Sequence, residues 1–312
     1  MIELTATEKQ ELRSKNYNAE LTSVRLAHRE LGFFTVKPDK GVPPHRAGQY
    51  LTLGLGLWEP RVASASSDLA SAPDLSKVLR RAYSISHPIL DDAGDLLPPH
   101  RGVLDFYIVL VGESSSGGPA GLTPRLFRLN EGDRLQVGER ITGHFTLAGV
   151  QPTDTVVFLA TGTGEAPHNY MIWELLSNQH AGPIVAVCCA RLKSDLGYLL
   201  THERLMARYP NYHYVPLTTR EPLDLGKKVY IQGLLESGAL ETQTGVHFDP
   251  GDCHVFLCGN PKMIGVPVYD RATGAKVYPQ PPGCVELLER RGFQSDVPGQ
   301  KQRGNIHFEE YW

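Results

Sequence analysis

The chain has 312 residues, of which 41% are hydrophobic and 21% charged, so it has the composition of a globular protein and the length for two domains. The net charge of -3 argues against a nucleic-acid-binding protein, and no apolar run is long enough to span a bilayer. The N-terminal residues are polar and lack the apolar core of a signal peptide, so we expect a cytoplasmic protein.

Cysteine and histidine spacing gives no sign of a metal site. The five cysteines are an odd number without a C-x-x-C pair, so we expect neither a disulfide framework nor a zinc or iron–sulfur site. The twelve histidines are scattered and are interpreted as surface or core residues.

Residues 1–18 read as a polar arm or short helix, and residues 19–150 as an antiparallel β-barrel domain. Short strand-like segments, separated by turn residues, are typical of such a barrel. The expected strands are residues 21–26, 33–36, 49–53, 81–86, 104–111, 135–137 and 145–147. Residues 59–80 and 87–102 are expected to be surface loops, and 112–120 an extended loop.

The strand Arg81-Ala82-Tyr83-Ser84 carries the first ligand-binding pattern. Alternate side chains of a strand share a face, so Arg81 and Tyr83 present a guanidinium and an aromatic ring together, with the Ser84 hydroxyl beside them. An anionic, planar, hydrogen-bonding ligand such as a flavin dinucleotide needs these three groups. An exposed barrel strand with one core tyrosine is the alternative.

A glycine-rich loop, residues 117–125, enters a short predicted helix. Thr123 is the expected N-cap and Pro124 the first helical residue. Free backbone N–H groups at such a loop favour a phosphate, so the loop is a candidate second contact for a pyrophosphate, although a plain capped helix explains it equally well by itself.

From about residue 151 the pattern changes to alternating strands and helices, which predicts a parallel sheet in an α/β domain, residues 151–312. The expected strands include 156–160, 184–189 and 255–258, with helices at 167–178 and 198–209. Residues 266–283 are expected to be a loop insertion.

The first strand of this domain ends in a glycine-rich turn that contains Gly162 and Gly164. Its place between a buried strand and a helix favours a dinucleotide site. No Lys-Ser/Thr follows the glycines, which argues against a nucleotide-hydrolysing P-loop.

Basic residues follow the next strands. Arg191 stands where a site for an unphosphorylated ribose would carry an acidic residue, and so it favours a 2′-phosphate. Arg220 and Lys228 add positive charge, and Tyr230 can stack on an adenine. A solvated surface charge is the simpler interpretation of each basic residue alone.

The segment Cys258-Gly259-Asn260-Pro261-Lys262 ends the last predicted strand and starts a helix at Pro261. Gly259 permits the close approach of a ring. Cys258 is a candidate contact of a nicotinamide, or else a small buried apolar residue.

Taken in order, Arg-x-Tyr-Ser, Gly-Thr-Gly, Cys-Gly-Asn-Pro and the terminal Tyr-Trp resemble the bacterial ferredoxin–NADP⁺ reductases, from about residue 20 to the end. The resemblance implies a Greek-key barrel with one helix that holds FAD, followed by an α/β domain that holds NADP and ends in an aromatic tail. It implies hydride transfer between NADPH and FAD and single-electron exchange with ferredoxin or flavodoxin, with no metal of its own.

The resemblance also implies the roles of individual residues. The catalytic residues would be Ser84 near the flavin N5, and Cys258 and Thr163, which shape the nicotinamide site, Thr163 lying where the two rings meet. The FAD-binding residues would be Arg81, Ala82, Tyr83, Ser84, Tyr107, Gly121, Leu122, Thr123, Thr163 and, in the tail, Tyr311 and Trp312. The NADP-binding residues would be Gly162, Gly164, Ala190, Arg191, Thr219, Arg220, Lys228, Tyr230, Gly259, Asn260, Pro261 and Lys262.

One residue departs from the family pattern without explanation, since Glu165 stands where an apolar residue is usual. Two other functions fit the same motifs: an NADH-preferring reductase component of an oxygenase system, and a flavin- or nucleotide-binding sensor without turnover. We expect a monomer, with a basic docking face for an acidic carrier formed from Arg80, Arg125, Arg128, Arg290 and Arg291.

Overall fold

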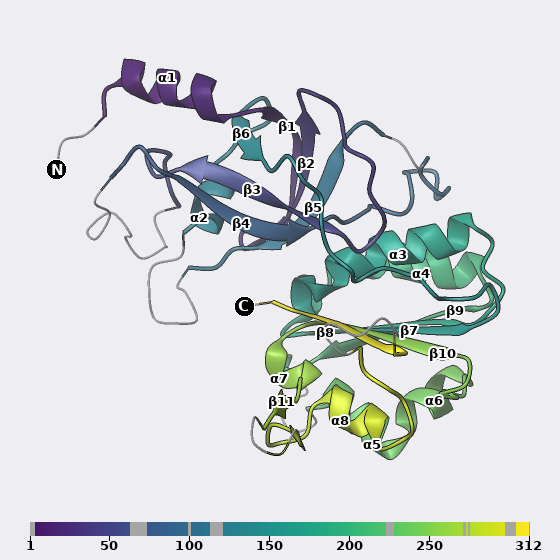
Figure 1. Cartoon of the computed structure of the whole chain (residues 1–312). Helices are drawn as coiled ribbons and strands as arrows, with labels where there is room; N and C mark the ends of the chain where they lie inside the picture. The colour runs from purple at the N-terminus through teal and green to yellow at the C-terminus, as the bar shows by residue number, and fades with distance from the viewer. Residues whose placement is uncertain are drawn as a thin grey trace. The chain divides into compact units, whose positions relative to one another are not determined.

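The computed structural model of the chain describes residues 4–62, 74–98, 101–112, 121–222, 228–270, 273, 275–296 and 304–311. Two compact units are present, each with its own sheet (Figure 1). The first comprises Met1–Pro88 and Leu97–His144, and the second Ile89–Leu96 and Phe145–Trp312.

The first unit is built on a six-stranded antiparallel sheet. Its strands are β1 (Ala19–His28), β2 (Leu31–Pro38), β3 (Tyr50–Gly56), β4 (Val78–Ser84), β5 (Leu104–Val109) and β6 (Arg134–Val137), in the order β4-β3-β6-β1-β2-β5. An isolated antiparallel bridge between Ser86 and Asp105 joins the residues just after β4 to β5, which are the two ends of this order. The predicted class of antiparallel, barrel-like fold is therefore confirmed for this unit.

The N-terminal arm contains a helix, α1 (Ala6–Asn16), that has no buried residue of its own. The side chain and backbone of Thr5 exchange hydrogen bonds with Glu8 in a capping box that fixes the start of the helix. At its other end Arg13 and Tyr17 both bond the buried carboxylate of Glu59, at 2.6–2.8 Å. These polar contacts, rather than an apolar face, attach the arm to the chain that follows β3.

The second unit has a five-stranded parallel sheet in the order β13-β10-β7-β8-β9. Its strands are β7 (Thr155–Thr161), β8 (Ile184–Ala190), β9 (Tyr212–Thr218), β10 (Cys253–Gly259) and β13 (Ile306–Glu310). Every residue of β8 is buried, as a strand covered on both faces requires. The predicted α/β class is confirmed, whereas the edge strand β13 was not predicted.

Helices lie on both faces of this sheet (Figure 1). One face carries α3 (Glu165–Ser177) and α4 (Leu199–Arg208), and the other α5 (Ile231–Ser237), α6 (Ala239–Thr244) and α8 (Cys284–Glu289). Apolar side chains of α5, α6 and α8 pack with β7, β8 and β10 in one continuous core that includes Leu159, Leu234 and Leu288. All five cysteines of the chain are buried with free thiols.

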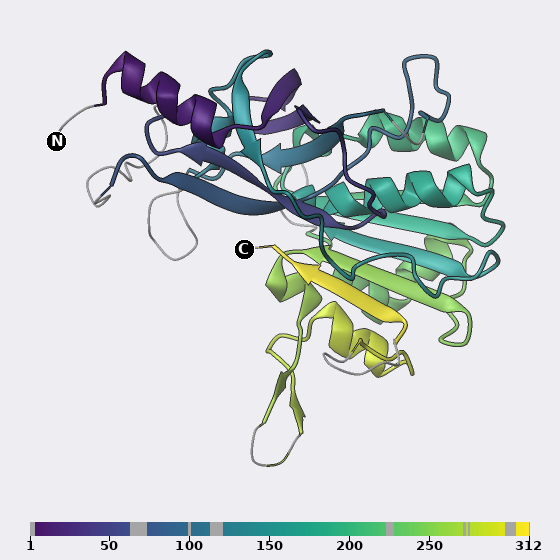
Figure 2. The same cartoon turned by 45° about the horizontal axis from the view of Figure 1, so that its top comes forward.

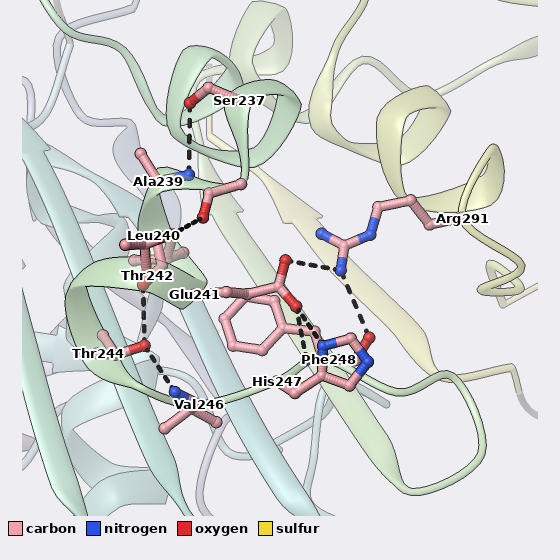
Figure 3. Close-up of polar contacts among 11 residues, drawn as sticks. Ser237, Ala239, Leu240, Glu241, Thr242, Thr244, Val246, His247, Phe248 and Arg291 are labelled. Carbon is pink, nitrogen blue, oxygen red and sulfur yellow. Dashed lines mark hydrogen bonds and ion pairs between the residues drawn. The ribbon is translucent and has the colours of Figure 1, made fainter.

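The chain after α6 is fixed by one carboxylate (Figure 3). Glu241 Oε1 accepts the backbone N–H of Phe248 at 2.8 Å and lies 3.0 Å from His247 Nδ1. Its other oxygen, Oε2, pairs with the Arg291 guanidinium at 2.9 Å. Glu241 therefore joins α6, the chain before β10 and the end of α8.

Three local expectations are wrong. Residues 145–147 form no strand; instead the Phe145 ring packs in the second unit, 5.6 Å from that of Phe256. The helix α2 (Thr123–Leu126) has Leu122 as its N-cap, so Thr123 is not the cap. The insertion 266–283 is not only a loop, because β11 (Val268–Tyr269) and β12 (Lys276–Val277) form a hairpin that projects from the unit (Figure 2). No helix in the described ranges is long and apolar enough to cross a membrane.

Candidate functional site

The first group of predicted residues lies on β4 and beside it. Arg81 is exposed, Tyr83 is half-buried and Ser84 is buried. A Cβ added at Gly121 would lie 3.9 Å from Arg81 Nη2, so the end of the glycine-rich segment meets the guanidinium. Burial raises the pKa of Tyr83, with the Arg81 charge opposing it, so the phenol keeps its proton and can donate a hydrogen bond. The structure thus places an exposed guanidinium, which donates to the Arg80 carbonyl at 3.1 Å, beside an aromatic ring and the backbone of Gly121.

Thr123 has a different local role from the one expected. Its Oγ1 accepts the backbone N–H of Val111 at 3.0 Å, which joins the start of α2 to the chain just after β5. Tyr107 lies on β5, buried, with its ring 4.9 Å from that of Phe33. The start of α2 is therefore joined to the chain after β5, the strand that carries Tyr107. Residues 117–120 of the glycine-rich loop lie outside the described residues.

A fully buried arginine supports this segment. Arg125 donates to the carbonyl oxygens of Gly121 at 2.7 Å and of Leu57 at 3.1 Å. Sequence reasoning placed Arg125 on a basic docking face, and this is wrong because no part of the residue is exposed. Arg290 and Arg291, expected on the same face, form ion pairs with Glu286 and Glu241.

In the second unit the Gly162–Gly164 turn fits against the end of β10. A Cβ at Gly164 would lie 2.2 Å from the Cys258 carbonyl oxygen, so only glycine allows this approach. Gly259 has φ +124°, and the Thr161 hydroxyl accepts the backbone N–H of Asn260 at 2.7 Å. The two predicted motifs therefore form one surface at the carboxyl ends of adjacent strands, where open α/β sheets bind ligands.

The segment that follows is held by its own side chains. Asn260 caps α7 (Pro261–Ile264), with its side chain accepting from the Lys262 N–H at 2.8 Å. Gln232 of α5 donates to the Lys262 carbonyl at 3.3 Å. The start of α5 is therefore attached to the Cys-Gly-Asn-Pro-Lys segment.

The aromatic tail lies on the same segment. The N–H of Tyr311 donates to the Gly259 carbonyl at 2.8 Å. Cys258 is fully buried, and burial raises the pKa of its thiol well above the usual range, while the nearby Tyr311 hydroxyl acts in the opposite direction. Tyr311 therefore lies directly beside Cys258, and the predicted role of Cys258 as a nicotinamide contact stays a prediction. Trp312 lies outside the described residues.

The basic residues predicted after β8 and β9 are brought together. The Thr219 and Arg220 N–H groups donate to the Ala190 and Arg191 carbonyls at 3.1 and 2.8 Å respectively. The Thr219 hydroxyl also donates to the Ala190 carbonyl at 3.2 Å. Both arginines are exposed, so two guanidinium groups stand free at neighbouring strand ends.

Lys228 and Tyr230 lie beyond residues 223–227, which are outside the described residues. Both are exposed, and they line a cavity of about 620 Å³ with Gln232 and with Pro281 and Pro282 of the insertion. The exposed Tyr230 ring offers a surface there on which an adenine can stack.

Glu165 had no explanation in the sequence, whereas the structure shows its contacts. It is the first residue of α3, and only 3% of it is exposed. Its carboxylate accepts from Tyr214 of β9 and pairs with His202 of α4. Tyr212 and Tyr214 share one face of β9, and this spacing was the only sequence pattern that could have indicated a buried polar cluster. It did not identify Glu165 as their partner. Among the residues that the structure describes, no group of acidic, histidine or cysteine side chains could hold a metal ion.

Comparison with known proteins gives a consistent result. Residues 158–267 match the model of the oxidoreductase NAD-binding domain family. A flavodoxin/ferredoxin–NADP reductase of Escherichia coli (strain K12) is 30% identical over 232 residues, covering 74% of this chain and 80% of that protein. Ferredoxin–NADP reductase A of Sorangium cellulosum is 30% identical over 233 residues, covering 72% and 71%.

The fold is also found among solved structures. A ferredoxin NADP⁺ reductase from Neisseria gonorrhoeae, solved with bound FAD and NADP, superposes with a TM-score of 0.65 over 94% of this chain and 97% of that chain. Its sequence identity is 18%, so this likeness concerns the fold.

Proposed function

Since the chain belongs to the flavodoxin/ferredoxin–NADP reductase family, we propose that it catalyses hydride transfer between NADPH and FAD and exchanges single electrons with ferredoxin or flavodoxin. The protein acts in the cytoplasm as a monomer, and its five free, buried thiols are consistent with a reducing compartment. Residues 19–150 form the FAD-binding domain and residues 151–312 the NADP-binding domain.

The residues of the first unit fit a flavin dinucleotide. Arg81 supplies an exposed guanidinium next to the backbone of Gly121, as a pyrophosphate requires. Tyr83 supplies a ring and a protonated hydroxyl, and Ser84 lies next to it on β4. A bound flavin would supply hydride acceptance and single-electron release, which no side chain can supply.

The residues of the second unit position the nicotinamide nucleotide. The Gly162–Gly164 turn and the Cys258–Gly259 backbone form the surface on which the nicotinamide lies, with Thr163 at its edge. Tyr311 covers this segment, and so the aromatic tail must shift for the ring to reach Cys258. Hydride transfer needs no general acid, because the protein has only to hold the reacting atoms about 3–3.5 Å apart.

The proposed preference of the site for NADPH over NADH rests on one observation. Arg191 and Arg220 are both exposed and are joined by the backbone hydrogen bond between them, at the ends of adjacent strands. Two guanidinium groups so placed favour a ribose that carries a 2′-phosphate. An NADH-specific site would need an acidic residue at this position instead.

The test is a spectrum of the purified protein, followed by anaerobic titration with NADPH. We expect flavin absorption near ~450 nm that bleaches on titration. Steady-state assays with ferredoxin coupled to cytochrome c should show a higher kcat/KM for NADPH than for NADH. A protein that binds no flavin, or one that prefers NADH, would contradict the proposal.

A further inference from the structure

Glu165 is a buried acidic residue next to the proposed nicotinamide site, and the hydride transfer itself gives it no role. It follows the Gly162–Gly164 turn directly and begins α3, a helix of 13 residues. A carboxylate in the first turn of a helix is stabilised by the partial positive charge there. Burying a carboxylate costs free energy, so the position of Glu165 beside a proposed ligand-binding turn calls for an explanation.

Two side chains contact the carboxylate, and a third contacts one of these two. Its Oε1 accepts a hydrogen bond from the Tyr214 hydroxyl at 3.1 Å and lies 3.0 Å from His202 Nε2. The Tyr212 hydroxyl lies 2.7 Å from His202 Nδ1. All four residues are nearly inaccessible to solvent, so these contacts exclude water from the carboxylate.

The four side chains form one hydrogen-bonded cluster. Burial raises the pKa of Tyr212 and Tyr214 well above the usual range, and the Glu165 charge raises them further, so both phenols keep their protons. His202 hydrogen-bonds the Tyr212 hydroxyl through Nδ1 and faces Glu165 through Nε2. Glu165 is the acidic member of this cluster, so removing its charge changes the charge of the cluster by one unit.

The Glu165 carboxylate is linked to the turn through Cys188. The Cys188 thiol donates to the Gly162 carbonyl at 3.8 Å, and its pKa is raised well above the usual range by burial and next by Glu165. Glu165 is two residues from Thr163, so the Cα atoms of the two residues are at most about 8 Å apart. At such a distance inside a protein, a charge still acts on a ligand.

We propose that the Glu165 charge sets the preference of this site between the two redox forms of the nucleotide, in favour of the oxidised nicotinamide. The inference rests on the proposed function, which places the nicotinamide at this turn. The oxidised ring carries a positive charge and the reduced ring is neutral, so a nearby negative charge stabilises only the oxidised form. Neutralising Glu165 should weaken NADP⁺ binding about fivefold relative to a neutral-ring analogue.

The experiment measures the dissociation constants of NADP⁺ and of tetrahydro-NADP for the flavin-loaded protein. Tetrahydro-NADP has a neutral ring and cannot donate a hydride, so it binds without reducing the flavin. Glu165→Gln keeps the side-chain shape and removes the charge. We expect the ratio of the two constants, NADP⁺ over analogue, to rise about fivefold in this variant.

Two variants separate charge from packing. Glu203→Gln removes a charge from the exposed face of α4 and should leave the ratio unchanged. Tyr214→Phe removes a hydrogen bond to Glu165 but keeps its charge, and should also leave the ratio within about twofold of the wild type. If Glu165→Gln does not fold, Glu165→Met is measured instead and should raise the ratio in the same direction.

The outcomes test the effect of the Glu165 charge and the proposed function separately. An unchanged ratio in the Glu165 variant, or an equal rise with Tyr214→Phe, overturns the role of the charge while leaving the proposed function intact. A wild-type protein that binds flavin but neither nucleotide contradicts the proposed function, and the inference with it.

Discussion

Gly164 and Cys258 meet through their backbones, so closely that a Cβ added at position 164 would lie 2.2 Å from the Cys258 carbonyl oxygen. The contact joins the turn after β7 to the end of β10, two segments about ninety residues apart in the sequence. The geometry of the proposed nicotinamide site depends on it, because each segment fixes the position of the other.

Gly164→Ala should therefore separate the two segments. We expect NADPH-dependent flavin reduction to fall about 100-fold, since a displacement of about 1 Å is enough for such a loss. Flavin binding should persist, because Arg81, Tyr83 and Gly121, the proposed pyrophosphate and ring contacts, lie in the other unit. Stopped-flow absorbance measures the rate. Gly233→Ala is the matched control: it lies in α5 with nothing within 4 Å of an added Cβ, and should stabilise the protein by about 0.5–1 kcal/mol.

Arg220→Ala tests the phosphate-binding assignment. The variant loses a charge-assisted contact with the 2′-phosphate, so kcat/KM for NADPH should fall about tenfold to a hundredfold while that for NADH stays the same. Steady-state kinetics with both nucleotides measure this. Arg204→Ala, at an exposed position on α4, should change neither value. Equal losses of kcat/KM for NADPH and NADH would show that Arg220 does not contact the 2′-phosphate.

Glu241→Ala should lower stability without affecting nucleotide specificity. The variant breaks the ion pair with Arg291 and the hydrogen bond from the Phe248 N–H, both partly buried (Figure 3). We expect a loss of about 1–2 kcal/mol in the free energy of unfolding, read from urea denaturation. Glu236→Ala, at an exposed position on α5, should stay within about 0.5 kcal/mol of the wild type.

His168 makes the second unit sensitive to acid. Its ring is fully buried between Phe145 and Phe158, and burial lowers its pKa to about 3. Between the ordinary pKa of about 6.5 and this value, only the unfolded chain binds the proton, so the free energy of unfolding must fall as the pH falls.

His168→Phe should remove this contribution. The slope of the free energy of unfolding between pH 6 and pH 4 should decrease by up to about 1.4 kcal/mol per pH unit, measured by urea denaturation at each pH. His144→Gln, at an exposed position, should leave the slope as it is. A slope unchanged in His168→Phe would mean that His168 is protonated in the folded protein.

Sequence reasoning reached the fold class because its signals are local. The fully buried apolar strand β8 and the glycine turn after β7 are visible within a few residues each, and their order predicts a parallel sheet with ligands at its carboxyl edge. Alternation is a weaker guide on β4, where Arg80, Arg81 and Ala82 are all exposed. Local pattern misplaced residues 145–147, since a short apolar run does not show which unit will bury it.

The sequence by itself determined the two kinds of sheet and the places where ligand-binding motifs follow their strands. Only the tertiary structure decided which side chains are buried beneath those motifs. Arg125 reaches Leu57, and Glu165 meets His202 and Tyr214, which lie 37 and 49 residues further along the chain. Such contacts depend on how helices and strands pack on one another, and neither periodicity nor spacing along the chain contains that information.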